Sequence, residues 1–239
     1  MTNFFRQNFD KPQLIPLLFI VMATIVLTSL GVWQVKRLIW KNGLIAEIKH
    51  AESMPSLASL PRLLDDKSRK SLEYRKVNIR GEFKYDMTLH MVGRQLGSIP
   101  GYFMVTPFEI VEDGRIILVN RGFSPLNKES KPQGIQEVTG IIRPARTKRY
   151  FSPENMPEKN IWFYEDIVAM SGKTGLDITP IIVEEVKKKG DKGFPIAGDG
   201  KTNLYNAHLG YTITWFSTAI IGIIMFGFYY RKKDKDIKE

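Results

Sequence analysis

The 239-residue chain contains no cysteine and only three histidines. Without cysteine it can form no disulfide bond, offers no thiolate nucleophile and supplies no Cys ligand to copper or iron–sulfur centres. The histidines, His50, His90 and His208, are too far apart in the sequence for a metal-binding motif. The candidate phosphate-binding loop that ends at Ser171–Thr174 has Ile167 in place of the first glycine. We find no catalytic motif and expect that the protein is not an enzyme.

Charged side chains are missing from two long stretches, Pro12 to Val35 and Thr202 to Tyr230. A helix needs about 20 apolar residues to cross the hydrocarbon core, and both stretches are long enough. The first is too long for the apolar part of a signal peptide and lacks a cleavage site, which favours an uncleaved anchor. We therefore predict transmembrane helices at 12–35 and 209–230, with one central domain, 36–208, between them.

Basic residues predict the orientation of the two helices. The C-terminal tail, residues 231–239, is rich in lysine and arginine, and such tails stay in the cytoplasm. Two crossings put the N-terminal tail, residues 1–11, on the same side. Lys36, Arg37 and Lys41 favour the opposite orientation, but long domains translocate largely regardless of charge. Because eleven residues leave no room for a transit peptide, we expect a bacterial inner (plasma) membrane and a periplasmic central domain.

The net charge of +10 would indicate nucleic acid as a partner of a soluble chain. In a chain anchored at both ends, membrane lipids or an acidic partner protein explain it better, and we expect no nucleic acid. Small residues four apart, which let helices approach closely, predict that the two anchors pack together. These residues are Thr24 and Thr28 on the first helix and Thr218 and Gly222 on the second.

The central domain is predicted to be mainly β. Helical spacing continues beyond Trp33 as far as Ile48, and the helix should end before Pro55. A connector over 54–71, with room for a short helix, should follow. Alternation and turn signals predict strands at 77–81, 88–92, 102–111, 115–119, 138–142 and 178–186.

Two local signals add detail to this domain. Asp113-Gly114 between apolar runs predicts a two-residue type I′ hairpin. Residues 163–170 predict a short helix that ends in a loop at Ser171-Gly172. The expected fold class is therefore an α+β membrane protein. Its two transmembrane helices flank a mainly antiparallel β periplasmic domain, a sheet or small barrel, with one or two short helices packed on it.

Three polar clusters have structural interpretations. Gly97 and Gly101, within a cluster that also contains Arg94, Tyr102, Thr106 and Pro107, are expected to supply turn geometry. Asn120-Arg121-Gly122 also predicts a turn, in which Arg121 pairs with an acidic neighbour. A basic loop is expected to be solvated near anionic headgroups; its residues are Arg143, Arg146, Lys148 and Arg149.

The start of the second apolar stretch is the strongest functional candidate. His208, Tyr211, Thr212 and Trp215 have the i, i+3, i+4, i+7 spacing of one helix face, and Trp33 is expected in the same leaflet. Tryptophan and tyrosine at this depth are ordinarily interfacial anchors. An ionisable His208 at a membrane boundary is instead a functional signal, because a neutral imidazole beside an aromatic-walled slot suits a haem iron. Both interpretations remain open.

Motifs in order along nearly the whole chain resemble the Surfeit locus protein 1 (SURF1/Shy1) family. The N-terminal motif is Leu30-Gly31-Val32-Trp33-Gln34, with Arg37 and Lys41. The central motifs are Tyr74-Arg75-Lys76-Val77, Gly81, Phe83, Arg94, Gly97, Gly101-Tyr102, Thr106-Pro107, Val119-Asn120-Arg121-Gly122, Phe151, Pro153, Asn155, Pro157, Trp162 and Asp166. The last motif is Asn206, His208-Leu209, Tyr211 and Thr214-Trp215-Phe216. The chain departs from the family pattern at Phe123, Ala207, Gly210 and Thr212.

The resemblance implies an assembly factor for haem–copper cytochrome c oxidase of the bacterial type, which holds haem a and assists its placement in subunit I. It implies His208 as an axial ligand of the haem iron, and subunit I as a partner, with haem a synthase as a further candidate. Our own additions are Trp215, Tyr211 and Trp33 as walls around the macrocycle. Arg37, or a loop base at Arg146 or Arg149, could meet the propionates.

Two other interpretations stay open. The first is a membrane scaffold that binds nascent oxidase subunits and never binds haem. The second is a membrane-tethered periplasmic enzyme, which would need a catalytic constellation that the sequence does not offer.

Overall fold

The computed structural model describes residues 13–61, 65–92, 99–125, 128–187, 190, 193–202 and 204–231. The chain divides into two compact units, a helical unit made of Met1–Ala46 with Leu204–Glu239, and a sheet unit made of Glu47–Asn203. Arg94, Gly97, the N-terminal tail and the basic tail beyond Arg231 lie outside the described residues.

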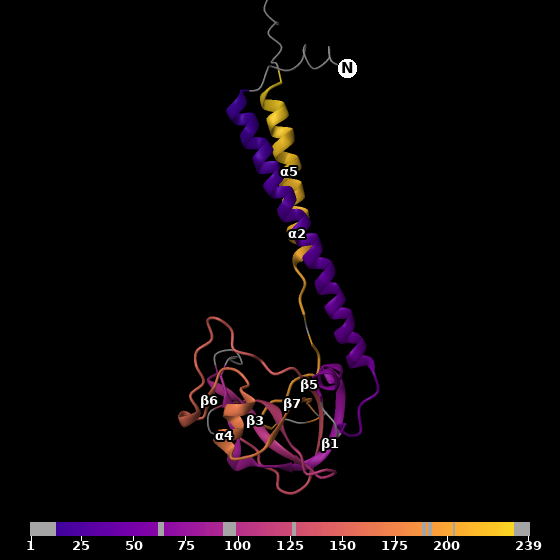
Figure 1. The fold of residues 1–239 in the computed structure, drawn as a ribbon, viewed down its shortest axis with the longest axis vertical. Helices are drawn as coiled ribbons and strands as arrows, with labels where there is room; N and C mark the ends of the chain where they lie inside the picture. The colour runs from indigo at the N-terminus through magenta and orange to yellow at the C-terminus, as the bar shows by residue number, and fades with distance from the viewer. Residues whose placement is uncertain are drawn as a thin grey trace, which may run out of the picture. The chain divides into compact units, whose positions relative to one another are not determined.

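The helical unit is built from two long helices, α5 (His208–Tyr229) and the part of α2 (Leu14–Ser53) that ends at Ala46 (Figure 1). Each is long and apolar enough to cross a membrane. The 40 residues of α2 extend about 60 Å at 1.5 Å per residue, twice the roughly 30 Å of a hydrocarbon core. The helix ends two residues before Pro55, which confirms that it continues beyond the apolar stretch and stops where proline forbids it.

The two helices pack along a seam with heptad spacing. Buried and half-buried side chains recur alternately three and four residues apart on both helices, the spacing of an antiparallel or parallel coiled coil. The seam positions are Ile20, Thr24, Leu27, Gly31, Gln34 and Leu38 on α2 and His208, Thr212, Trp215, Ala219, Gly222 and Phe226 on α5. Ile20 lies opposite Gly222 while Gln34 lies opposite His208, so the helices are antiparallel.

The prediction that the anchors pack together through small residues was right for Thr24 and Gly222 and wrong for Thr28 and Thr218. The latter two are exposed, because the 3.5-residue repeat places residues 27 and 219 in the seam instead. The closest approach is at Gly31, where an added Cβ would lie 2.8 Å from the ring of Phe216.

Cysteine pairs will test this seam in the full chain, which has no cysteine of its own. Ile20→Cys with Gly222→Cys should form a disulfide on mild oxidation, since a Cβ at position 222 would lie 3.4 Å from Ile20 Cδ1. Thr28→Cys with Thr218→Cys, both exposed, is the matched control and should react poorly. Mass spectrometry of the linked peptides measures both yields. A control pair that links better than the seam pair would contradict the register.

The sheet unit contains seven strands within the described residues (Figure 1). Their bounds are β1 Lys76–Phe83, β2 Leu89–Met91, β3 Gly101–Ile110, β4 Ile116–Pro125, β5 Gln136–Arg143, β6 Ile161–Trp162 and β7 Ile178–Glu185. The order is β1-β5-β7-β4-β3-β2-β6, and β1 also pairs with β3, so β1, β5, β7, β4 and β3 close into a five-stranded barrel. Pairing is antiparallel except at β4–β7 and β2–β6. The prediction of a mainly antiparallel sheet or barrel is therefore confirmed.

Alternation along each strand produces two apolar clusters. Strand β1 alternates strictly between exposed and buried residues, as predicted, and its buried residues join β4 residues such as Ile117 and Val119 in one cluster. Leu118, on the opposite face of β4, joins Trp162 and Met170 in a second cluster. Met170 belongs to α4 (Ile167–Thr174), which packs beside β7. The remaining short helices are α3 (Asp66–Leu72), η1 (Tyr85–Met87) and η2 (Pro157–Lys159).

Two predicted turns differ in the structure. The loop between β3 and β4 comprises residues 111–114 and not only two residues, and the backbone N–H of Gly114 donates to the carbonyl oxygen of Ile110. A type I′ turn would need positive φ at both Asp113 and Gly114, but only Gly114 has it (70°). Helix α4 begins at Ile167, because the carboxylate of Asp166 caps its N-terminus. The helix includes Ser171 and Gly172, and it ends at Thr174, where Gly175 adopts the left-handed conformation that terminates it.

The described glycines of the two glycine-containing clusters, Gly101 and Gly122, also lie in strands. Gly101 opens β3, where an added Cβ would meet the Ser124 carbonyl at 2.2 Å, so close strand packing and not a turn requires it. Arg121 and Gly122 together lie opposite Met104, which makes a β-bulge in β4 in place of the predicted turn. Gly122 has φ 103°, a conformation that suits glycine, and the neighbouring Arg121 is buried.

Candidate functional site

A hydrogen bond between Gln34 and His208 is the central feature of the helical unit. His208 is the first residue of α5, and its Nδ1 lies 2.7 Å from Oε1 of Gln34, which is only 8% exposed. With an amide oxygen as the partner atom, this bond is made by the Nδ1–H tautomer, in which Nδ1 donates the ring proton. In the neutral ring, Nε2 then bears a lone pair, which is the form that a metal requires.

A second polar layer fastens the approach to α5 onto α2. Asn206 donates from Nδ2 to Asn42 Oδ1 at 2.8 Å, and its Oδ1 accepts the backbone N–H of His208 at 3.3 Å. Lys41 Nζ donates to the carbonyl oxygen of Tyr205 at 2.5 Å. These contacts hold the first turn of α5, and therefore the backbone of His208, against α2.

The layer on the other side of His208 is aromatic. Trp215 follows seven residues later in the seam, roughly 10 Å along the helix, and is half-buried. Its indole N–H is buried and has no hydrogen-bond partner within the described residues. An unpaired buried donor costs about 1–3 kcal/mol, so a polar ligand group that accepted this bond would be stabilised. The ring of Phe216 packs on Gly31 nearby.

The remaining predicted site residues lie outside the seam. Trp33 is 55% exposed and Tyr211 56% exposed, so both face away from the contact between α2 and α5. The guanidinium of Arg37 lies 3.9 Å over the ring of Trp40, one turn further along the exposed side of α2. The structure thus brings together His208, Thr212 and Trp215 but places Tyr211 on the flank of that face.

Sequence reasoning quoted Gln34 and Asn206 only as parts of motifs and gave them no role. A signal was available for Gln34. The first apolar stretch contains two carboxamides, Gln13 at its start and Gln34 near its end, and a buried carboxamide needs a partner. What the sequence could not supply was the helix register that places His208 opposite.

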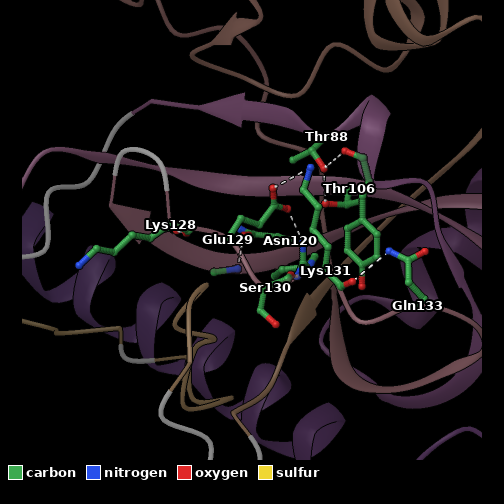
Figure 2. A network of polar contacts seen from close by, with 12 residues as sticks. Thr88, Thr106, Asn120, Lys128, Glu129, Ser130, Lys131 and Gln133 are labelled. Atoms are coloured by element: carbon green, nitrogen blue, oxygen red, sulfur yellow. Dashed lines mark hydrogen bonds and ion pairs between the residues drawn. The ribbon is translucent and has the colours of Figure 1, made fainter.

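The conspicuous basic residues of the sheet unit are engaged in ion pairs. Arg121 is 5% exposed, packs over the ring of Tyr85 at 4.7 Å and pairs with Glu129, as predicted. It also donates to the carbonyl of Ser130. Figure 2 shows Glu129 and Ser130 in one polar network with Asn120 and the hydroxyl contact of Thr88 and Thr106. This network fastens the segment after β4 to the barrel.

The basic loop is not solvated throughout, which corrects the prediction for Arg143, whereas Arg146 is exposed, as expected, and also forms an ion pair. Arg143 is largely buried and donates from Nε to Glu184 at 2.6 Å. Arg146 donates from Nε to Glu165 at 2.7 Å. Lys148 pairs with Glu154, and Arg149 is exposed. Within the described residues, no group of three or more acidic or histidine side chains could hold a metal ion.

His90, on β2, differs from His208 in its surroundings. It is half-buried, and its ring stacks on Tyr102 with centroids 5.1 Å apart. Burial lowers the pKa of His90 from its usual 6.5, with nearby Glu129 opposing the shift and Lys131 adding to it. The folded state therefore favours the neutral ring.

This depressed pKa predicts an acid-sensitive contribution to stability. The unfolded chain binds the proton more readily, so the contribution is complete above about pH 6.5 and is lost as the pH falls through the folded pKa. Thermal midpoints of the full chain in detergent, from about pH 7.5 to about pH 5, should show a shallower decline for His90→Gln than for wild type. His50→Gln, at an exposed position, should not change the slope. An unchanged slope in His90→Gln would refute the prediction.

Comparisons with known proteins agree with the motif analysis. A protein-family model described as the SURF1 family matches residues 21–220. The chain is 36% identical over 219 residues to Surfeit locus protein 1 of Rattus norvegicus, covering 83% of this chain and 70% of the relative. It is 35% identical over 219 residues to the Homo sapiens protein of that name, covering 82% and 71%. The SURF1-like protein of Caenorhabditis elegans is 30% identical over 230 residues, covering 85% and 70%.

Proposed function

Because the chain belongs to the SURF1 family, we propose that it is an assembly factor for haem–copper cytochrome c oxidase that holds haem a and assists its placement in subunit I. The proposed role is to carry a cargo and involves no catalysis. Subunit I is the proposed recipient of the haem, and haem a synthase is the candidate donor.

The observation that carries the haem proposal is the His208–Gln34 hydrogen bond. The bond occupies Nδ1 of His208 and leaves Nε2 as the lone-pair donor that an axial haem ligand requires. A metal-binding histidine ordinarily has its other ring nitrogen fixed in this way. His208 is also the only histidine of the helical unit, so this unit offers a single imidazole to the iron. One imidazole ligand suits a protein that must release its cargo.

Other residues would contact the rest of the haem. Trp215, seven residues after His208, has a buried indole N–H without a partner among the described residues, and a polar group at the edge of the haem would accept its hydrogen bond. The exposed rings of Trp33 and Tyr211 provide apolar surface on the outside of the helix pair. The guanidinium of Arg37 would attract the propionates, while Arg146 is already paired with Glu165. Bound haem a would supply the iron and the apolar tail that the oxidase receives.

We place the helical unit in the bacterial inner membrane, with both termini in the cytoplasm and the sheet unit in the periplasm. Both helices have the length and composition for this, and basic residues follow α5. Membrane lipids are then the surroundings of α5 and of the apolar part of α2.

Reporter fusions test this topology. Alkaline phosphatase, which is active only outside the cytoplasm, should be active when fused after Gly134, an exposed loop residue of the sheet unit. The same reporter fused after Glu239 should be inactive. The reverse pattern would overturn the orientation and the periplasmic location of the sheet unit.

Haem content of the purified protein tests the cargo. From cells that make haem a, wild-type chain should copurify with haem and show a Soret band, and His208→Ala should lose most of it. His50→Ala, exposed and in the sheet unit, is the control and should keep it. Retention of the seam disulfide between positions 20 and 222 in His208→Ala would show that the helices still pack. Wild-type haem content in His208→Ala would contradict ligation and favour the scaffold that binds only oxidase subunits.

A further inference from the structure

We propose that Gln34 is a positioning residue for His208, which selects the ring tautomer and thereby sets which nitrogen is offered to a ligand. The proposal rests on the proposed function only in naming that ligand as the haem iron. A neutral histidine carries its proton on either nitrogen, and the hydrogen bond that one nitrogen makes decides between them. Here Oε1 of Gln34 is the acceptor at Nδ1, at 2.7 Å.

The burial of Gln34 restricts where its carboxamide can find a partner. The side chain is buried in the seam between Gly31 and Leu38, where the α-helix fixes its backbone. Burying a carboxamide in apolar surroundings is unfavourable unless it is hydrogen-bonded. With the amide oxygen facing Nδ1, as it does here, His208 relieves that cost when Nδ1 carries the proton. The Nε2–H tautomer would instead require the carboxamide to turn over and present its NH2 group to Nδ1.

The choice of a neutral amide also matters. A carboxylate at this position would draw the Nδ1 proton more strongly and make Nε2 a more basic ligand. It would also have to be buried as a charge. Gln34 orients the imidazole ring but makes Nε2 a weaker ligand than a carboxylate partner would. A weaker bond to the haem iron suits a protein that later releases its haem.

Gln34 could instead serve only as a polar contact that holds the helices together. Asn206 provides the matched control for this role, because it too makes polar contacts across the helix pair, to Asn42 and Leu38, without touching the His208 ring. A purely structural role predicts that Gln34→Leu and Asn206→Ala have similar effects. A positioning role predicts a change in the ring of His208 that only Gln34→Leu produces.

The test is nitrogen NMR of ¹⁵N-histidine-labelled full chain in detergent, without haem, at mildly alkaline pH. Protonated and unprotonated ring nitrogens have well-separated shifts, and His50→Gln and His90→Gln assign the three rings. Wild type and Asn206→Ala should show His208 with the proton on Nδ1. Gln34→Leu should populate the Nε2–H tautomer, and Gln34→Glu, which keeps an acceptor, should restore the Nδ1–H form. A wild-type His208 spectrum in Gln34→Leu would overturn the proposal.

Haem binding provides the second readout. Added haem should bind Gln34→Leu about 10- to 100-fold more weakly than wild type, the loss typical of an outer-shell partner, and Gln34→Glu at least as tightly. If the tautomer changes in Gln34→Leu as expected while wild type binds no haem, the haem proposal fails and the selection by Gln34 stands. If haem binds wild type and Gln34→Leu equally while the tautomer is unchanged, the positioning role fails and the haem proposal stands.

Discussion

A polar side chain between two apolar helices must find a hydrogen-bonding partner there, because neither hydrocarbon nor aliphatic side chains can offer one. Gln34 and His208 satisfy this requirement for each other. Their pairing agrees with the register of the antiparallel helices, since Ile20, 14 residues before Gln34, meets Gly222, 14 residues after His208. A slip of one residue would leave both polar groups unpaired, so the register and the state of the histidine ring depend on one contact.

Close packing around that contact follows from small residues. Gly31 lies one turn from Gln34, and the Phe216 ring occupies the space that its side chain would need. On the other side of His208, Asn206 anchors the start of α5 to Asn42. The imidazole is therefore held between an aromatic layer and a polar layer, each fixed by α2.

The sheet unit uses its charged residues differently. Arg121, Arg143 and Arg146 each form an ion pair with a carboxylate, to Glu129, Glu184 and Glu165 respectively. Arg121 and Arg143 are largely buried cations that need such partners, so these two residues contribute to the architecture of the barrel, whereas the Arg146 side chain is 50% exposed. In the helical unit, by contrast, the polar contact between the helices is a hydrogen bond between His208 and the buried carboxamide of Gln34.

Local chemistry in the sequence was sufficient to predict where most elements lie. The alternation of apolar and polar residues predicted strand β1, Pro55 predicted the end of α2, and the uncharged stretches predicted the two apolar helices. Each of these features depends only on residues that are close together in the sequence. The family also followed from motifs in order along the chain, which the comparisons confirm. His208 was singled out from its place at the start of an apolar stretch.

Contacts between distant residues were decided only by the tertiary structure. No local rule places Gln34 beside His208, since 174 residues separate them and only the heptad register of the packed helices brings them together. The same reason moved Thr28 and Thr218 out of the contact and turned Asn120-Arg121-Gly122 from an expected turn into a bulge. The sequence by itself determined which residues are apolar, polar or able to bind a metal. Packing decided which of them meet, because burial forces each polar group to find its partner across the fold.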